Sequence, residues 1–576
     1  MTRYDYAVIA FYFIFMLGMG WLVSRFVKTS RDYFAGGGRM LWWLVGASAF
    51  MTQFSAWTFT GAASKAYSEG WPIFVVFFGN ALGFFLNSLY FAARSRQMRL
   101  VTALEAVRER FSKTNEQLFT WMQIPLGTLY AGIWLNGLSV FLTAAFGFDL
   151  QLTIIVTGLV VVAMTLVGGS WAAVAGDFIQ ALILLPVTVV AAFLALRAVG
   201  GPGAFLDRLP AGHLDVAAIF DSPMMMLWVF AIFIKQFIST NNLFEASRYL
   251  CVKDSRHARW AAILAGILFV GGPVIWFITP MAARILFPDL HAVFPNLRNP
   301  HEGAFFAICV ATMPAGMIGL LVSGMLSATM SSMDSGLNKN AAIFIKNFYQ
   351  PVLRPKATDV QLIFAGRIAT AALGLLVILA GLNFSRLEHI GLFDLMLRFG
   401  TLVAVPYTIP LTLCVLFKRT PPWSGWTTVL VCMLASYLTT TFLTPAWLER
   451  TFALAPLTTA EGSYWIITAG LLMNVSVGCA WFFGSSLFWP RSPAPDRERI
   501  EGFFNRMLTP IATTELEGSN DRQQGQVLGL LCLCYGAFIL ALALIPNPLL
   551  GRLCFVFCGA TVCGVGLLLR RRGRTD

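Results

Sequence analysis

Residues 47–64 read ASAFMTQFSAWTFTGAAS, and this stretch departs from the continuous apolar helix that normally spans a membrane. Polar and small residues crowd its middle: Thr52, Gln53, Ser55, Thr58, Thr60 and Gly61. Small and hydroxyl side chains also permit close helix packing, but a glutamine in the same turn fits that explanation less well. The stretch therefore predicts a broken helix whose freed carbonyl groups face a ligand.

The whole chain has the composition of a membrane protein. Of its 576 residues, 57% are hydrophobic and only 12% are charged, and its mean hydropathy is +0.71. Soluble domains carry roughly 25% charged residues, so an assembly of soluble domains is excluded. The net charge of +13 sits in short clusters between apolar segments, which is typical of membrane topology rather than of nucleic-acid binding. The cysteines and histidines show no metal-binding spacing.

About fifteen apolar segments are long enough to cross a bilayer, for which roughly 20 residues suffice. We expect them near residues 4–26, 42–66, 71–94, 119–147, 150–169, 172–199, 223–247, 258–286, 304–344, 362–384, 391–417, 424–445, 463–489, 525–546 and 550–569. The first segment lacks a small-residue cleavage site, so we interpret it as a retained helix and not as a signal peptide. The prediction is an all-α polytopic membrane protein.

Basic residues gather in every second loop. This set begins with Arg25, Lys28, Arg31 and Arg39, passes through Arg108, Arg110, Arg248 and Lys253, and ends with Arg570, Arg571, Arg572 and Arg574. The positive-inside rule then predicts an outside N-terminus, a cytoplasmic C-terminus and an odd number of spans. We expect the protein in the plasma membrane, specifically a bacterial inner membrane, and we interpret the polar segment near 490–524 as a cytoplasmic linker.

A second polar interruption occurs at residues 235–242, which read KQFISTNN. Such a stretch is a poor candidate for a helix that faces lipid, so it predicts a second discontinuous helix. One broken helix at the start of each half of the chain is the pattern of an inverted repeat.

A third departure lies at residues 324–340, GMLSATMSSMDSGLNKN. Ala328, Ser331, Ser332 and Ser335 are spaced i, i+3, i+4 and i+7, so they share one helical face, and Asp334 lies beside it. Hydroxyl oxygens with a nearby carboxylate suit a hard cation. The same spacing also suits a packing stripe whose hydroxyls bond to their own backbone, and spacing alone leaves both interpretations open.

Two charges, Asp177 and Lys235, fall within predicted spans. An isolated charge there costs at least about 2.5–3.5 kcal/mol, so each needs a partner, water or an ion. Asp394 and Arg398 are spaced i, i+4, and we expect them to neutralise one another.

The stretches DYFAGGGRMLWWLVGASAF, SAWTFTGAAS, GGSWAAVAGDFIQ and SATMSSMDSGLN occur in this order and together resemble the sodium:solute symporter family. That resemblance implies a LeuT-like fold of two inverted five-helix halves with one preceding helix. It assigns residues 1–30 to the leading helix and residues 31–420 to a ten-helix core. Residues 421–576 would form about four peripheral helices.

The resemblance also implies two cation sites. The main sodium site would use the carbonyls of Met51, Phe54 and Ala328 and the hydroxyls of Ser331 and Ser332. A possible second cation site would use Asp177, Asp334 and Ser335. Asp334 stands where the family pattern has a hydroxyl, so a proton or a structural pair are alternatives to a second sodium ion.

The substrate pocket is less strongly implied. Sugar-carrying relatives have a Ser-Ala-Glu-Gln-like run in the first broken helix, whereas residues 55–58 here read SAWT, which is nearer to the proline-type pattern. The residues expected to face the substrate are Gln53, Trp57, Thr58, Gln236, Asn241 and Asn242. Lys235 is expected either to contact a carboxylate or to pair between helices.

These features favour a transporter in which Na⁺ drives uptake of a small organic solute, a sugar, an amino acid or a carboxylate, by alternating access. Its partners would be the solute, sodium and the bilayer. A proton-coupled or uncoupled transporter or channel of the same fold is the alternative. A membrane-embedded enzyme would need a convergent acid, base or metal constellation, which is not apparent in the sequence, so we do not expect an enzyme.

Overall fold

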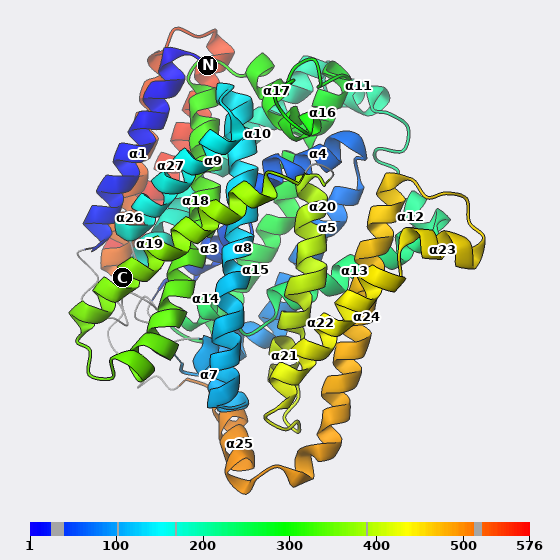
Figure 1. The fold of residues 1–576 in the computed structure, drawn as a ribbon. Coiled ribbons are helices and arrows are strands. Elements are labelled where there is room, and N and C mark those ends of the chain that lie inside the picture. The colour runs from blue at the N-terminus through cyan, green and yellow to red at the C-terminus, as the bar shows by residue number, and fades with distance from the viewer. Residues whose placement is uncertain (25–39, 101–102, 168–169, 388–389, 512–520, 576) are drawn as a thin grey trace.

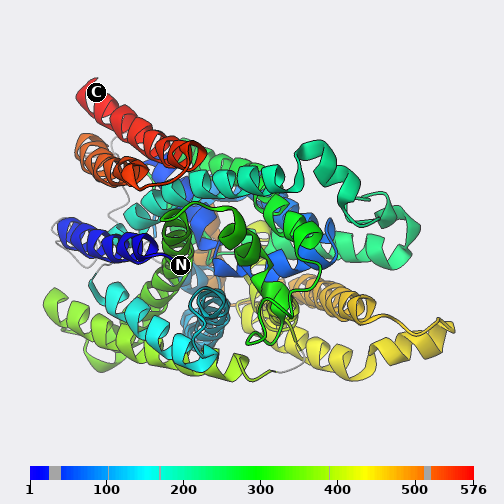
Figure 2. The ribbon, with the colours of Figure 1, turned by 90° about the horizontal axis from the view of Figure 1, so that it is seen from above.

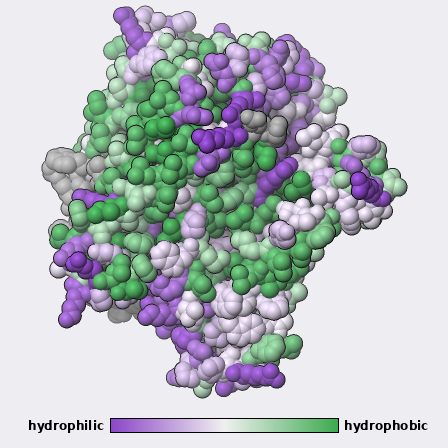
Figure 3. Space-filling model, viewed as in Figure 1, coloured by the Kyte–Doolittle hydropathy of each residue, from purple (hydrophilic) through white to green (hydrophobic). Residues whose placement is uncertain are grey.

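The computed structural model describes residues 1–24, 40–100, 103–167, 170–387, 390–511 and 521–575. Helices form nearly all of the regular structure in these ranges, and the one β-type contact found there is an isolated bridge between Met40 and Val252. A helix satisfies its backbone hydrogen bonds internally, which is what a lipid environment demands. Apolar side chains accordingly cover much of the middle of the face in Figure 3, whereas hydrophilic ones gather toward its two ends.

Eleven described helices are long and apolar enough to cross a membrane. They are Pro72–Gln97, Lys113–Phe146, Ala175–Val199, Pro223–Thr240, Ser255–Leu286, Asp359–Phe384, Leu392–Leu416, Ser424–Phe442, Thr459–Arg491, Gln524–Leu544 and Leu549–Arg571. The other four predicted spans are also helical: α1 (Arg3–Ser24), the broken unit that begins with α3 (Trp42–Thr52), α9 (Leu150–Val167) and α18 (Met317–Phe344). The all-α prediction is confirmed.

Both predicted helix breaks are present. After α3 the chain turns through extended Ser55, forms the short 3-10 helix η2 (Ala56–Phe59) and resumes as α4 (Gly61–Ser68). In the second half, α13 (Pro223–Thr240) stops at residue 240 and α14 (Ala246–Leu250) follows the gap.

The helices that carry these breaks and their neighbours pack in two groups within the bundle of Figure 1. In one group α3 packs on α15 (Ser255–Trp276), and α5 (Pro72–Leu86) packs on α13 and α15. In the other group α8 (Lys113–Phe146), α9, α18 and α19 (Asp359–Phe384) pack on one another. Glycines allow the close approaches: a Cβ on Gly46 of α3 would lie 2.8 Å from the Ala261 carbonyl of α15.

Two helices join these groups to the rest of the bundle. The long α10 (Ser170–Val199) packs on both α3 and α18. A later span runs from α20 (Leu392–Phe399) through a π-helical turn, η6 (Gly400–Ala404), into α21 (Val405–Leu416).

The four late spans split into two pairs at separate sides of the bundle (Figure 2). The pair α22 (Ser424–Phe442) and α24 (Thr459–Gly484) packs on α21, and α24 also contacts α13. The pair α26 (Asp521–Ala541) and α27 (Leu549–Thr575) packs instead near α1 and α10, where Phe11 stacks on Phe538. The amphipathic helix α25 (Ala494–Leu508) lies between the two pairs in sequence and contacts α7 (Ala103–Arg110).

The sequence analysis placed Arg110 among the basic residues of a loop. In the structure its side chain is fully buried at the end of α21. Its guanidinium donates to the carbonyls of Cys414, Phe417 and Thr420 at 3.1, 2.8 and 3.4 Å and to the Thr420 hydroxyl at 2.5 Å. The last carbonyls of a helix lack intrahelical partners, so this side chain satisfies a helix end that is buried. Burial also lowers the pKa of Arg110 to about 10.

We expect Arg110→Lys to destabilise the protein, because an ammonium group cannot reproduce the fork of four contacts. Leaving buried carbonyls unsatisfied costs about 1–3 kcal/mol. Thermal unfolding of the purified protein measures this effect. Arg108→Lys is the control, since the Arg108 side chain is 49% exposed and lies 3.7 Å from Glu116. Equal unfolding temperatures for the two variants would contradict the role assigned to Arg110.

Candidate functional site

The break after α3 brings several backbone carbonyls to one hydroxyl of α18. Ser332 Oγ lies 2.7 Å from the Phe54 carbonyl and 3.3 Å from each of the Met51 and Ala328 carbonyls. A hydroxyl has one proton and can donate to one of these oxygens at a time. The remaining oxygens therefore converge on a point without a donor, and an oxygen cluster of this kind matches the ligand preference of a hard cation.

Four of the five residues predicted for the main sodium site thus meet at Ser332. The fifth, Ser331, is adjacent in α18, but its hydroxyl donates to Asp177 Oδ1 in this conformation. The second oxygen of Asp177 accepts from the Ser48 hydroxyl at 2.5 Å.

Arg248 is a half-buried part of this site that the sequence analysis assigned to a cytoplasmic loop. It lies in α14, directly after the second helix break, and its side chain is 14% exposed. Its guanidinium donates to Ser48 Oγ and to Thr52 Oγ1, both at 2.6 Å, and lies 3.8 Å from Asp177. Arg248 therefore ties the second broken helix to the first. The one feature of the sequence that could have indicated this role is its position, six residues after the KQFISTNN stretch.

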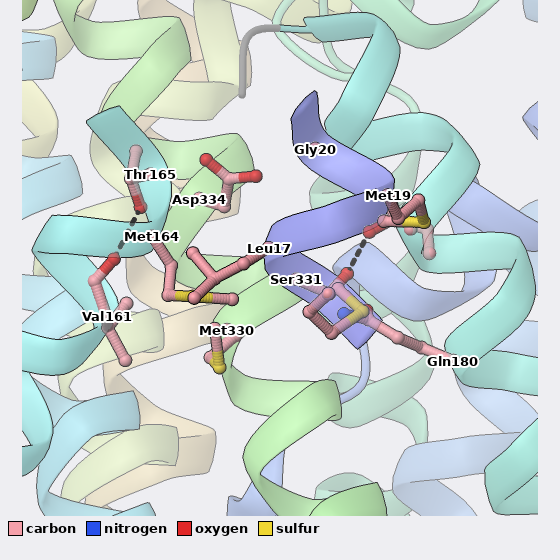
Figure 4. Close-up of a pocket in the computed structure, with 13 residues that line it drawn as sticks. Leu17, Met19, Gly20, Val161, Met164, Thr165, Gln180, Met330, Ser331 and Asp334 are labelled. Atoms are coloured by element: carbon pink, nitrogen blue, oxygen red, sulfur yellow. Dashed lines mark hydrogen bonds between the residues drawn. The ribbon is translucent and has the colours of Figure 1, made fainter. Parts of the chain in front are cut away.

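The predicted second cation site borders a small cavity of about 50 Å³ between α1, α9, α10 and α18. Asp177, Ser331 and Asp334 line it together with Thr165, and Figure 4 shows Asp334 of α18 and Thr165 of α9 at this cavity. Asp334 also accepts from the Asn338 amide at 2.7 Å. The side chain of Ser335, like residues 32–39 and 168–169 of the sequence motifs, lies outside the described part of the structure.

A larger cavity of about 320 Å³ adjoins both helix breaks. Four of the six residues predicted to face a substrate line it: Gln53, Trp57, Gln236 and Asn242. Thr58 is buried but is not part of the lining, and Asn241 uses its amide to donate to the Gly83 and Phe237 carbonyls. Lining residues that the sequence did not single out include Asn80, Gln123, Tyr130, Trp134 and Lys339. Asn80, Gln123, Tyr130 and Trp134 come from helices without polar interruptions, so the sequence carried no local signal for them, whereas Lys339 belongs to the polar stretch 324–340.

The cavity is closed toward the end of the bundle that carries the N-terminus of α1. Trp57 lies between Phe77 and Phe393, at centroid distances of 6.5 and 5.9 Å and nearly parallel to both. Its indole N–H donates to the Leu392 carbonyl at 3.0 Å. At the opposite end, the lining reaches Ala103 of α7, Gln123 near the start of α8 and Asn340 near the end of α18.

A buried polar contact between α4 and α24 lies beyond Trp57. The Lys65 ammonium is 2.5 Å from Glu69, and the Tyr464 hydroxyl donates to the same carboxylate. Asp394 accepts from Ser463 of α24 at 2.6 Å. The predicted Asp394–Arg398 ion pair was wrong for the described structure, because Asp394 faces α24.

Comparison of this chain with known protein families gives a match over most of its length. A family model described as the sodium:solute symporter family matches residues 33–422. The chain belongs to this family. Among curated members, it is 27% identical over 416 residues to the sodium/myo-inositol cotransporter 2 of Oryctolagus cuniculus, covering 65% of this chain and 60% of that protein. It is 25% identical over 409 residues to the sodium/glucose cotransporter of Vibrio parahaemolyticus, covering 65% and 73% of the two chains.

The fold has a solved counterpart in the substrate-bound, outward-open state of a Na⁺-coupled sialic acid symporter. The TM-score is 0.65 at 20% identity, and the match covers 85% of this chain and 98% of that one. The LeuT-like fold expected from the sequence is confirmed. The chain spans about 60% of the length of several curated relatives that it matches.

Glu302, in the 3-10 helix η4 (Pro300–Gly303) outside the membrane spans, holds the start of α20 beside the closed end. Its carboxylate accepts from the Leu392 N–H at 2.8 Å and from the Asn299 amide at 3.3 Å. Burial raises the pKa of Glu302 to about 7.

A carboxyl group whose pKa is raised in the folded state binds more protons when folded than when unfolded. Its ionisation therefore opposes folding, and stability falls as pH rises from about 4.5 to about 7. We expect the unfolding temperature to fall over this range in the wild-type protein and to fall less in Glu302→Gln, which keeps an acceptor for Leu392. Parallel pH dependences in the two proteins would contradict this prediction.

Proposed function

We propose that this protein is a secondary active transporter that couples Na⁺ to the movement of a small organic solute by alternating access. The observation that carries the proposal is the convergence of the Met51, Phe54 and Ala328 carbonyls on Ser332, beside a cavity at two broken helices. A channel needs no such asymmetric ion site. The described residues contain no group of three or more His, Cys, Asp or Glu that could hold a catalytic metal.

In this proposal Na⁺ binds the three carbonyls and the hydroxyls of Ser331 and Ser332. Ser332 then turns its proton away from Phe54, and Ser331 releases Asp177. The ion links α3, from the first packed group, to α18, from the second, and so favours one arrangement of the groups over the other. Each charge moving inward gains about 2.3 kcal/mol per 100 mV, which corresponds to roughly 50-fold accumulation of a neutral solute.

We further propose that the solute occupies the larger cavity, where Gln53, Trp57, Gln236 and Asn242 are available to it. Thr58 and Asn241 are left out of this assignment because they do not line the cavity. The core is assigned to residues 31–420, after a leading helix in 1–30 and before the peripheral helices in 421–576.

The proposed topology has the N-terminus outside and the C-terminus in the cytoplasm, in a bacterial inner membrane. It is supported by the basic residues at the α7 end of the bundle, such as Arg99, Arg108 and Arg499. With this topology the conformation described above is closed to the outside, and its cavity extends toward the cytoplasm.

Asp177 and Asp334 are proposed to serve a second cation, either sodium or a proton, with Ser335 as a further ligand. Both carboxylates line the same small cavity, where two negative charges repel one another. A cation bound between them would remove this repulsion, which supports the assignment.

Uptake into proteoliposomes tests the proposed function. The purified full-length chain is offered labelled sugars, amino acids and carboxylates, with an inward gradient of Na⁺, an inward gradient of H⁺, or neither. Accumulation above the external concentration under the Na⁺ gradient supports symport. Accumulation under the H⁺ gradient alone would overturn the coupling ion, and equilibration without any gradient would overturn coupling itself.

We expect Ser332→Ala to weaken Na⁺ binding at least tenfold, because it removes one ligand and the hydroxyl at the centre of the carbonyl cluster. An ion that binds the folded state raises the unfolding temperature in a concentration-dependent way, so a Na⁺ titration measures the change. Ser323→Ala is the matched control, since that α18 hydroxyl donates to the Gly319 carbonyl of its own helix. Indistinguishable Na⁺ titrations of the two variants would contradict the assignment of Ser332 to the Na⁺ site.

A further inference from the structure

Lys235 presents an ammonium group to the larger cavity without an anionic protein partner in the described structure. Its residue is 8% exposed, and the one contact found for its Nζ is the Gln236 side-chain carbonyl at 3.2 Å. An ammonium has three donors, so two of them have no protein acceptor here. A buried charge in this condition is costly, and binding sites are where such a cost is offset by a ligand.

A second unused donor lies beside it. A Cβ placed on Gly400 in the η6 turn would be 3.3 Å from Lys235 Nζ and 3.3 Å from the Tyr130 hydroxyl. Both polar groups therefore approach the same backbone position, and a side chain there would press against them. The Tyr130 hydroxyl makes no hydrogen bond within the described residues, and Tyr130 also lines the cavity.

The charges around the cavity favour an anion. The lining contains Lys235, Arg248 and Lys339 but one carboxylate, Glu245. Arg248 is engaged by Ser48, Thr52 and Asp177. The Lys339 ammonium donates to the Phe244 carbonyl at 3.2 Å, lies over the Phe244 ring and interacts electrostatically with the Glu245 carboxylate. Lys235 is therefore the cation of this lining for which the described structure shows neither an anionic partner nor an aromatic ring under the charge.

We propose that the transported solute carries a carboxylate and that Lys235, assisted by the Tyr130 hydroxyl, binds it. This inference rests on the proposed function and narrows its substrate class. The rings of Trp57 and Phe77 line the same cavity and provide an apolar surface for the rest of the solute. A hexose, which has no anionic group, would leave the ammonium uncompensated.

Ligand-induced thermal stabilisation of the purified chain in NaCl tests the inference without requiring transport. The probes are monocarboxylates of two to ten carbons, aliphatic and aromatic, each beside its neutral amide, together with hexoses, zwitterionic amino acids and an exchange of chloride for methanesulfonate, which has no carboxylate. We expect a carboxylate to stabilise the protein and its amide to bind at least tenfold more weakly. Equal effects of acid and amide, a preference for hexoses, or saturable stabilisation by chloride alone would overturn the inference.

Two substitutions separate binding from structure. Lys235→Gln is expected to lose at least tenfold in carboxylate affinity, whereas Lys339→Gln, at another lysine of the same cavity, should change it less than threefold. Lys235→Met should raise the unfolding temperature of the ligand-free protein, since it removes an uncompensated buried charge. A lower unfolding temperature would mean that Lys235 pairs structurally and would overturn the inference. Sodium-driven uptake of a neutral solute that is unaffected by Lys235→Gln would keep symport and reject the carboxylate.

Discussion

A helix that stops inside the bilayer leaves carbonyl groups that no lipid can satisfy, and the site of this protein is organised around that constraint. The end of α3 exposes the Met51 and Phe54 carbonyls, and α18 meets them with a single hydroxyl and the Ala328 carbonyl. The protein supplies fewer donors than acceptors at this point. A bound cation would satisfy the unpaired carbonyl oxygens and would also connect the two packed groups of helices. Cation binding at these few atoms would therefore change the relative stability of the arrangements of the two groups.

The positive charges of Arg110, Arg248 and Lys235 are compensated by the protein to different extents. Arg110 and Arg248 are enclosed by oxygens: the first by a helix end, the second by two hydroxyls and a nearby carboxylate. Lys235 has one amide oxygen, that of Gln236, within hydrogen-bond distance and no carboxylate partner in the described structure. The guanidinium groups therefore behave as parts of the framework, whereas the Lys235 ammonium remains available to a solute.

Much of this architecture was visible in the sequence, because a membrane penalises polar interruptions so strongly that each one is informative. Gln53 and the Asn241–Asn242 pair marked the two breaks, and the spacing of Ala328, Ser331 and Ser332 marked the face of α18. Arg110 and Arg248 were misread because the positive-inside rule uses position along the chain and takes no account of burial. The i, i+4 spacing of Asp394 and Arg398 is compatible with an ion pair on one helix. The structure instead places Ser463 of α24 beside Asp394, and no local sequence pattern predicts where α24 packs.

The contact of Tyr464 with Glu69 gives the outer helix α24 a part in any opening of the closed end. The half-helix α4 carries Lys65 and is followed directly by Glu69, whose carboxylate is held by the Tyr464 hydroxyl of α24, a helix at the lipid boundary. When α4 moves, either α24 tilts with it or the hydroxyl and carboxylate separate. In the first case the surrounding lipid must rearrange around α24, so the thickness and stiffness of the bilayer become part of the mechanical work of each cycle.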